Sequence, residues 1–322
     1  MKPCLPPCVV ADTLPAPSST CARRRWCPLS TAPRRTRFCA SLILSYVAAA
    51  SKTFLNGPRA AGHLPYGALM HDLKGKSILI TGASTGIGAA AARAFAQYGA
   101  NVAVHYNSSK DKAEEVAKDV RALGVTAITV GADVRDSKAI DAAVAQTVDA
   151  FGKIDVLVNN AGSLVKREPI ASVTDALFDE IMHINARSVV AFTRAALPSL
   201  RSCGGGSIIN VSSVAARNGG GPGALLYVAS KGFVSTITKG MVKELMADRI
   251  RVNAVAPGVI QTPFQERFTS PEQLESFRKS IPMGFIGEPD DCSGAFLYLA
   301  SEAMSRYVTG QIIDVNGGQL MP

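Results

Sequence analysis

The stretch that decides the fold reads Thr81-Gly82-Ala83-Ser84-Thr85-Gly86-Ile87-Gly88. It follows an apolar run typical of a strand, Ser77–Thr81, and precedes a helical pattern over Ala89–Tyr98. Glycines let a chain turn tightly and approach a pyrophosphate, and the free N–H groups of the next helix attract the anion. The spacing G-x-x-x-G-x-G differs from the G-x-G-x-x-G of long-chain dinucleotide-binding enzymes. A purely structural turn is the alternative, but the strand–turn–helix setting favours a phosphate-binding turn.

Outward from this turn, short apolar runs alternate with longer helical patterns. The predicted strands are Ser77–Thr81, Val102–His105, Ala127–Gly131, Val156–Asn159, Ser207–Val211, Val252–Val255 and Ile312–Val315. The predicted helices include Lys110–Leu123, Ser137–Phe151, Thr174–Leu200 and Tyr227–Met246. This alternation is typical of right-handed βαβ units in a parallel sheet. We therefore predict an α/β fold, a single Rossmann-like, doubly wound domain over residues 71–322 with a seven-stranded parallel sheet flanked by helices.

Charge and cysteines are distributed unevenly along the chain. The net charge is +9, but residues 1–70 hold nine Lys/Arg and one acid, whereas the remainder holds 25 Lys/Arg and 24 acids. The predicted domain has no excess charge for phosphates, so no nucleic-acid partner is expected. Beyond residue 70 the only cysteines are Cys203 and Cys292, which suggests a reducing, cytoplasmic compartment without disulfides. No metal-ligand spacing occurs, and no metal is expected.

Residues 1–70 are rich in Pro, Arg and Cys and show no sustained period. A basic cluster at Arg34–Phe38, followed by the apolar run Leu42–Ala50, superficially resembles a signal sequence. The run is shorter than the about 20 residues that span a bilayer, so no membrane partner is expected. Met70 immediately precedes the start of the predicted domain. An over-extended translation start or a disordered leader is favoured over a targeting signal.

The end of the second predicted strand bears on cofactor choice. An acidic residue there would bind the adenosine 2′-hydroxyl, but Tyr106 occupies that position and Asn107, Ser108 and Lys110 follow. A carboxylate would repel a 2′-phosphate, so its absence favours NADP(H). An Arg in the glycine turn would strengthen this expectation, and position 85 is Thr. Use of NAD(H) as well stays open.

Tyr227 and Lys231 stand four residues apart on a predicted helix, and their side chains therefore share a face. A free tyrosine has a pKa of about 10, too high for proton transfer at neutral pH. A nearby ammonium favours the phenolate, so we expect Lys231 to lower the pKa of Tyr227. An exposed Tyr–Lys pair on an amphipathic helix is the alternative for these two residues alone.

Other polar residues are predicted at the same edge of the sheet. Ser212 and Ser213 follow a buried strand, and Asn159 ends an earlier one. In open α/β sheets ligands bind at the carboxyl ends of the strands. Asn185 lies inside the long predicted helix, where a surface position is the alternative because mid-helix Asn is mildly unfavourable.

Together these motifs resemble the short-chain dehydrogenase/reductase family over about residues 73–320. The resemblance implies that Tyr227 transfers a proton to or from the substrate oxygen and that Ser213 hydrogen-bonds that oxygen. It further implies that Lys231 holds the nicotinamide ribose and that Asn185 keeps a water in a proton relay. The reaction implied is hydride transfer between a nicotinamide cofactor and an alcohol or ketone.

The resemblance also implies a set of cofactor contacts. Asp133 would hydrogen-bond the adenine amino group, and Ile260 and Thr262 would contact the nicotinamide end. The full expected set is Gly82, Ser84, Thr85, Gly86, Ile87, Gly88, Tyr106, Asn107, Ser108, Asp133, Val134, Asn159, Ala161, Gly162, Tyr227, Lys231, Pro257, Gly258, Ile260 and Thr262.

The substrate is constrained only loosely. Ile281–Pro289 is similar to the corresponding stretch of the family's glucose dehydrogenases, while the overall pattern also resembles its 3-ketoacyl reductases. Arg201 is the only basic residue just before the predicted strand that leads to Ser212 and Ser213. This makes an acyl-carrier-protein partner less expected but does not exclude it. A sugar, a small ketone and a 3-ketoacyl thioester stay open. A non-catalytic cofactor-binding regulator is the alternative, although such a protein would be expected to lack Tyr227 or Lys231.

We expect the pocket to be shaped by three loops and a lid. These segments are Ser163–Lys166, Ala215–Arg217 with Leu225 and Leu226, the flexible run Gly219–Gly223, and Pro263–Pro282. Four basic residues fall in or beside them: Lys166, Arg167, Arg217 and Arg267. They could bind an anionic substrate, but solvated surface charge is favoured.

Two predicted helices carry apolar residues on more than one face. These residues are Leu177, Ile181, Ile184, Val189, Phe192 and Leu197 in Thr174–Leu200, and Val234, Ile237, Met241 and Leu245 in Tyr227–Met246. Burial of this surplus against a two-fold mate predicts a homotetramer, consistent with the family resemblance. The alternative is that the surplus packs within a monomeric core.

Overall fold

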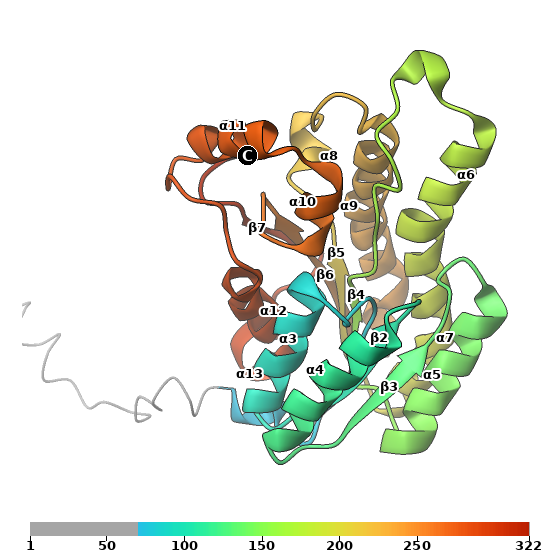
Figure 1. Ribbon diagram of the computed structural model, residues 1–322. Coiled ribbons are helices and arrows are strands. Elements are labelled where there is room, and N and C mark those ends of the chain that lie inside the picture. Colours follow the sequence, from blue (N-terminus) through green and yellow to red (C-terminus); the bar gives the residue numbers. More distant parts are fainter. Residues whose placement is uncertain (1–69, 322) are drawn as a thin grey trace, which may run out of the picture. The chain divides into compact units, whose positions relative to one another are not determined.

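The computed structural model describes residues 70–321, in which strands and helices alternate (Figure 1). The strands are β1 (Ser77–Ile80), β2 (Asn101–Tyr106), β3 (Ala127–Gly131), β4 (Val156–Asn159), β5 (Gly206–Val211), β6 (Ile250–Pro257) and β7 (Ile312–Val315). The α-helices are α3 (Gly86–Gln97), α4 (Lys110–Ala122), α5 (Ser137–Phe151), α6 (Asp175–Met182), α7 (Ser188–Ser202), α8 (Ala215–Asn218), α9 (Leu225–Leu245), α10 (Pro263–Phe268), α11 (Pro271–Ser280), α12 (Ser293–Ala300) and α13 (Glu302–Ser305).

All seven strands are parallel, in the order β3-β2-β1-β4-β5-β6-β7. The predicted α/β fold with a seven-stranded sheet is therefore confirmed. Strand β1 pairs with β2 on one side and with β4 on the other, so the chain changes direction across the sheet at this point. Ligands of doubly wound sheets bind at such a switch point, outside the carboxyl ends of the strands.

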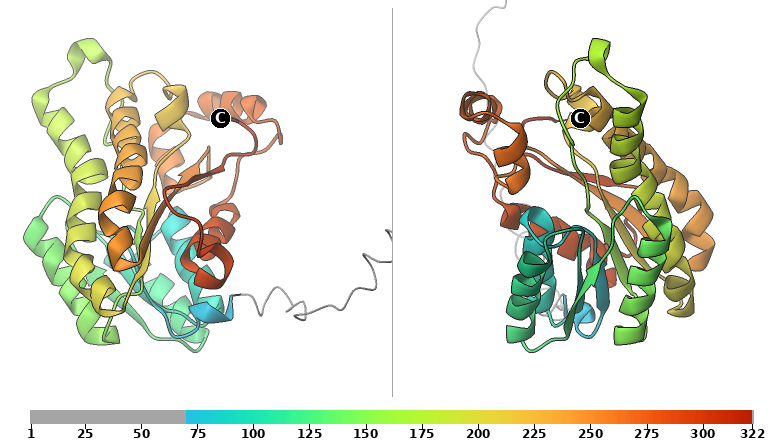
Figure 2. Two further views of the ribbon diagram at one scale, coloured as in Figure 1. Left: turned by 180° about the vertical axis from the view of Figure 1, so that it is seen from behind. Right: turned by 45° about the vertical axis from the view of Figure 1, so that its right-hand side comes forward.

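Helices cover both faces of the sheet, as Figure 2 shows. Alternate strand residues face opposite sides, so Ile78 and Ile80 of β1 pack with α3, α4 and α12, whereas Leu79 packs with α5, α7 and α9. Phe95 and Phe192 are fully buried, one in each layer. Burial of one such side chain is worth about 1.5–3 kcal/mol. The two apolar layers hold the sheet, and with it the loops at its carboxyl edge.

The helix predicted over Thr174–Leu200 is present, but it is not α-helical throughout. Helix α6 ends at Met182, His183–Arg187 forms a π-helical turn, and α7 then follows. Asn185 lies in this turn and is fully buried, which excludes the surface position. Its amide group binds the main chain of Ser163, and this contact accompanies the widened turn. Single π-helical turns occur frequently at functional sites.

The apolar residues that motivated the predicted assembly are mostly occupied inside one subunit. Leu177, Ile181, Val189, Phe192, Val234, Met241 and Leu245 are buried, and Ile184, Leu197 and Ile237 are half-buried against the core. That part of the argument for a homotetramer is therefore wrong. Other apolar side chains on the same helices are exposed, among them Phe178, Val190, Leu225 and Phe233.

The described part of the chain begins at a turn that is tied to the domain. Asp72 accepts hydrogen bonds from the Ser301 hydroxyl (2.8 Å) and from the N–H groups of Glu302 (2.7 Å) and Ala303 (3.1 Å) at the start of α13. The expectations for residues 1–69 lie outside the described residues. Within residues 70–321 no helix has the length and apolar character to cross a membrane, and no cluster of three metal-ligating side chains occurs.

Candidate active site

A cavity of about 620 Å³ opens at the carboxyl edge of the sheet. It is lined by most of the residues expected from the sequence, namely Gly82, Ser84, Thr85, Gly86, Ile87, Asn107, Ser108, Asp133, Val134, Ala161, Gly162, Ser213, Tyr227, Lys231, Pro257, Gly258, Ile260 and Thr262. Four expected residues do not line it: Gly88, Tyr106, Asn159 and Asn185. The structure thus brings the glycine turn and the Tyr–Lys pair to one cavity.

The glycine turn has the conformation and the space that a bound phosphate requires. Gly82 and Gly86 have positive φ angles, +62° and +56°. A Cβ on Gly82 would lie 2.9 Å from the Ala161 Cα, and one on Gly88 would lie 2.5 Å from the Gly82 carbonyl oxygen. Gly88 therefore permits close packing behind the turn rather than lining the cavity. Thr85 caps α3 without a side-chain hydrogen bond, so the N–H groups of the first turn are available to an anion.

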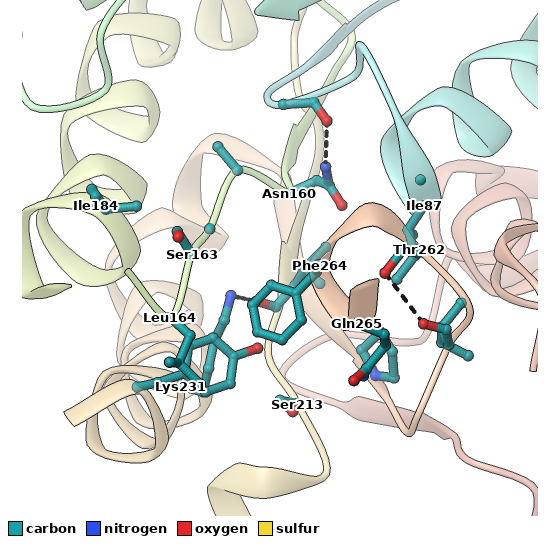
Figure 3. Close-up of a pocket in the computed structure, with 18 of the residues that line it drawn as sticks. Ile87, Asn160, Ser163, Leu164, Ile184, Ser213, Lys231, Thr262, Phe264 and Gln265 are labelled. Carbon is teal, nitrogen blue, oxygen red and sulfur yellow. Dashed lines mark hydrogen bonds between the residues drawn. The ribbon is translucent and has the colours of Figure 1, made fainter. Parts of the chain in front are cut away.

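Asn160 fastens the glycine turn to the end of β4. Its side-chain amide donates to the carbonyl oxygens of Thr81 (2.9 Å) and Gly82 (3.0 Å), as Figure 3 partly shows. Asn159, the residue expected here from the sequence, is buried beneath the site and donates to Asn210 (2.9 Å). The alternation of side chains along a strand distinguishes these two neighbours once the strand's end is known.

His105 supports the same turn from β2 and was not predicted. Its Nδ1 accepts a hydrogen bond from the Gly82 N–H (3.0 Å), and its Nε2 lies 3.1 Å from the Ala132 carbonyl oxygen, to which it donates. Burial lowers the pKa of His105 to about 4, so the ring is neutral at physiological pH. The ring also packs edge-on against Phe192. The position of this histidine inside an apolar strand run was the one feature of the sequence that could have indicated its role.

Tyr106, expected to contact the cofactor, lies away from the cavity. Its ring packs over Gly131 of β3, where a Cβ would come within 2.9 Å of the phenol oxygen. The next residues, Asn107 and Ser108, line the cavity instead. Consequently the polar groups presented by the end of β2 are uncharged.

Asp133 carries the negative charge nearest to the third strand's end. Its carboxylate accepts hydrogen bonds from the Arg135 side chain (2.7 Å for the closest pair), and this contact holds the pKa of Asp133 below its usual range. Arg135 also pairs with Glu180 at 3.3 Å. Asp133 thus stays an ionised hydrogen-bond acceptor at the cavity wall.

Tyr227 and Lys231 project from α9 on one face, with the Lys231 Nζ 5.8 Å from the centre of the tyrosine ring. Lys231 is buried and donates to the Val211 carbonyl oxygen (2.8 Å). Burial lowers the pKa of Lys231 to about 8. Burial also raises the pKa of Tyr227 to about 12, against a hydrogen bond with Ser213 that lowers it. Desolvation of the phenolate dominates in the protein alone, and the expectation that Lys231 lowers the pKa of Tyr227 stays a prediction.

The two serines after β5 have different partners. The Ser212 hydroxyl donates to the Lys231 carbonyl oxygen (3.0 Å) and lies 2.7 Å from the Ser235 hydroxyl. Ser213 accepts from the Ala215 N–H (3.1 Å) and shares a hydrogen bond with Tyr227. Ser212 is therefore occupied in positioning α9, and Ser213 is the serine beside the tyrosine hydroxyl.

Asn185 does not line the cavity but holds a loop that does. Its side chain accepts from the Ser163 N–H (2.9 Å) and donates to the Ser163 carbonyl oxygen (2.7 Å). Gly162 is enclosed between Asn185 and Lys231, because a Cβ there would lie 2.8 Å from the Asn185 Oδ1 and 3.1 Å from the Lys231 Nζ. Asn185 thus positions the loop after β4, which lines the cavity.

Helix α10 covers the far side of the cavity. The Phe264 ring lies 5.5 Å from the Tyr227 ring and 5.0 Å from the Phe268 ring, centre to centre. Figure 3 shows Phe264 over the site beside Lys231 and Leu164. Of the segments expected to shape the pocket, Ser163–Val165, Ala215 and Pro263–Gln265 line it, whereas Leu225 and Leu226 do not.

The glycine run 219–223 packs closely at the cavity mouth. Gly219, Gly220 and Gly223 have positive φ angles. A Cβ on Gly220 would lie 2.7 Å from the Val228 side chain, and the Gly223 carbonyl oxygen accepts from the Glu168 N–H (2.9 Å). These glycines provide turns and close contacts with the loop after β4.

A family profile described as "Enoyl-(Acyl carrier protein) reductase" matches residues 82–319. The 3-oxoacyl-[acyl-carrier-protein] reductase FabG of Staphylococcus aureus is 39% identical over 246 residues, covering 76% of this chain and 98% of the relative. The chain belongs to the short-chain dehydrogenase/reductase family. The uncharacterized oxidoreductase YhdF of Bacillus subtilis is 40% identical over 250 residues, covering 77% of this chain and 85% of the relative. This short-chain dehydrogenase/reductase is therefore an oxidoreductase by family.

Solved structures of family members agree with the fold. An NADH-dependent reductase, A1-R′, responsible for alginate metabolism, is 39% identical with a TM-score of 0.72, covering 78% of this chain and 100% of its own. A Burkholderia cenocepacia short-chain dehydrogenase in complex with NADP is 32% identical with a TM-score of 0.71, covering 77% of this chain and 98% of its own. Because neighbours bind NAD or NADP, and the glycine turn has room for a pyrophosphate, this protein takes a nicotinamide cofactor.

Proposed function

We propose that this short-chain dehydrogenase/reductase interconverts an alcohol and a ketone and prefers NADP(H). The observation that carries the proposal is the meeting of Ser213, Tyr227 and Lys231 in the cavity that also contains the glycine turn. Tyrosine and serine hydroxyls placed together can hold one carbonyl oxygen, and a buried ammonium beside them can support the charge left on the tyrosine.

In this proposal the cofactor, when bound, supplies or accepts the hydride. The glycine turn holds its phosphates at the start of α3, and Ile260 and Thr262 enclose its nicotinamide end. Ser213 and Tyr227 hydrogen-bond the substrate carbonyl oxygen. In reduction Tyr227 gives its hydroxyl proton to that oxygen, and in oxidation the Tyr227 phenolate takes the proton back.

The pKa values suit reduction at neutral pH. With a pKa of about 12, Tyr227 is protonated and ready to donate. Oxidation needs the phenolate, so a bound cationic nicotinamide and a charged Lys231 must both lower this pKa. Because the Asn185 side chain bonds to the main chain of Ser163 and donates to the Ile181 carbonyl oxygen (3.0 Å), a relay water would be held through the main chain of the π-helical turn.

The NADP(H) preference rests on charge. No carboxylate from β2 lines the described cavity, and Asn107 and Ser108 offer uncharged polar groups there. Asp133 is held by Arg135 farther along the edge. A 2′-phosphate would meet no repelling group at the end of β2. The ratio of kcat/KM for NADPH and NADH with one substrate tests this preference, and a tenfold preference for NADH would contradict it.

The substrate is a sugar, a small ketone or a 3-ketoacyl thioester. The near full-length match to FabG supports the thioester. A panel of all three classes, assayed with NADPH and NADH, tests the proposed function. Cofactor binding without turnover of any class would instead favour a non-catalytic regulator.

We further propose a cytoplasmic homotetramer. The support is the exposed apolar side chains Phe178, Val190 and Phe233, together with the two cysteines, both free, of residues 70–321. Light scattering at micromolar concentration measures the assembly, and a monomer mass would contradict it without affecting the catalytic proposal.

A further inference from the structure

The four basic residues in or beside the segments expected to shape the pocket fall into two pairs. Lys166 is neutralised by Glu168, and Arg217 by Asp314. Arg167 and Arg267 line the cavity, and neither has a carboxylate within ion-pair distance among residues 70–321. The cavity therefore contains two guanidinium groups whose charge the described protein does not neutralise.

Arg167 is held in place by neutral acceptors. Its Nε donates to the Phe268 carbonyl oxygen (2.8 Å), and one terminal nitrogen donates to the Pro222 carbonyl oxygen (3.0 Å). Carbonyl oxygens orient a guanidinium without cancelling its charge. The side chain is half-buried, so part of its hydration is lost as well. A cation that is fixed, partly desolvated and unpaired is ready to bind an anion.

Arg267 also lines the cavity, but its side chain is exposed. Its guanidinium stacks over the Phe268 ring at 5.1 Å. Phe268 contacts Phe264, and Phe264 contacts Tyr227, so a series of three rings connects the tyrosine to Arg267. Of these rings Tyr227 and Phe264 line the cavity, together with Arg167 and Arg267.

The carboxylates that line the cavity do not oppose these charges. Asp133 and Glu180 are both paired with Arg135 on the cofactor side. Glu266 precedes Arg267 but does not line the cavity. The substrate side of the lining thus carries a net positive charge.

We infer that the substrate carries a carboxylate or another anionic group, separated by several apolar bonds from the carbonyl or alcohol that reacts. The anion binds Arg167 and Arg267, and the intervening carbons lie along Phe264. This inference rests on the proposed function, since it places the reacting oxygen at Tyr227. It names the class of substrate that the cavity selects.

The test compares 7-oxooctanoate with its methyl ester, which differ only in the charge. A charge-assisted hydrogen bond is worth enough to give about a tenfold higher kcat/KM for the acid in the wild-type protein. The preference should fall as NaCl is raised, because salt screens partly exposed charges.

Substitution separates recognition of the anion from support of the lid. Arg167→Gln should lower kcat/KM for the acid about tenfold. The kcat/KM for the ester and the KM for NADPH should stay unchanged. Arg267→Gln removes no hydrogen bond. It should lower kcat/KM for the acid by a few-fold and leave kcat/KM for the ester unchanged. Lys166→Gln is the matched control, because its charge is already neutralised.

Each other outcome decides between explanations. Equal losses of kcat/KM for the acid and the ester in both Arg variants would show that the two arginines support the structure of the lid. That result would overturn the inference. A raised KM for NADPH would assign the arginines to the cofactor and also overturn it. Turnover of the ester without preference for the acid would leave the proposed function standing and overturn the inference alone. If neither probe is reduced, calorimetric titration of the NADPH complex decides: tighter binding of the acid supports the inference, and equal binding overturns it.

Discussion

The two halves of the cavity are built from different parts of the chain. The half that faces the glycine turn includes main chain that is positioned by contacts too close for a Cβ at Gly82 or Gly88. The half beyond Tyr227 is made of long side chains from α10 and the loop after β4, such as Phe264 and Arg167. Main chain can recognise a phosphate common to many cofactors, whereas side chains can change without disturbing the fold. The first half therefore suits a shared cofactor, and the second suits a particular substrate.

Tyr227 stands at the boundary of the two halves, and its loss should have the largest effect. Tyr227→Phe keeps the ring against Phe264 but removes the proton donor. Turnover should fall by about 10²–10⁴-fold, while the Kd for NADPH stays unchanged. Steady-state kinetics and a fluorescence titration measure the two quantities. Activity like that of the wild type would refute the mechanism.

The close packing of the cofactor half should make it intolerant of a single methyl group. Gly88→Ala places a Cβ 2.5 Å from the Gly82 carbonyl oxygen, so the turn must shift. We expect destabilisation by about 1–3 kcal/mol and a loss of NADPH affinity of tenfold or more. Thermal unfolding and calorimetric titration check these effects.

The matched control is Gly240→Ala in α9, where nothing lies within 4 Å of the added Cβ. Alanine in mid-helix is better than glycine by about 0.5–1 kcal/mol, so this variant should be slightly more stable and bind NADPH normally. If both variants behave alike, the cofactor half is not held by close packing.

Charge in the cofactor half should decide between the two nicotinamide cofactors. Because the Tyr106 side chain packs over Gly131, Asn107 is the better position for a test. Asn107→Asp should lower kcat/KM for NADPH about tenfold, because the carboxylate repels the 2′-phosphate. The kcat/KM for NADH should stay nearly unchanged. Asn107→Ser, which adds no charge, should keep the preference. Equal losses with both cofactors would show that the 2′-phosphate lies elsewhere.

Sequence reasoning was most successful where a structure is set by neighbours in the chain. The strand–turn–helix around Gly82–Gly88 and the pairing of Tyr227 with Lys231 depend on spacings of a few residues, and the structure places both at one cavity. The π-helical turn was missed because Asn185 finds its partner, Ser163, 22 residues away.

The substrate half depends on contacts that are longer still in sequence. Arg167 is oriented by Phe268, which lies 101 residues farther along the chain. Whether Arg167 forms an ion pair also depends on which basic side chains the carboxylates of other loops contact. Likewise, the sequence showed that Tyr106 follows an apolar run, but only the contact with Gly131 shows where its ring lies. A periodic pattern identifies an element and a face, and not the partner that its side chains meet.

The smallest effect on NADPH binding should come from His105, whose neutral ring supports the glycine turn of the cofactor half. His105→Leu leaves the Gly82 N–H without its acceptor, at a cost of about 1–3 kcal/mol in stability, and should weaken NADPH binding a few-fold. His105→Gln, which can accept the same hydrogen bond, should recover part of both.

The wild-type protein offers a pH test of the same contact. The folded-state pKa of His105 is lowered from 6.5 to about 4, so the folded state holds fewer protons than the unfolded state between these values. The contribution of His105 to stability is therefore complete above pH 6.5 and lost as the pH falls toward 4. Protonation of folded His105 also removes the Nδ1 acceptor of the Gly82 N–H, so the Kd for NADPH should rise only as the pH falls through about 4. The His105→Leu variant should lose this pH dependence, whereas a dependence that persists in it would assign the titration to another group and separate His105 from the glycine turn.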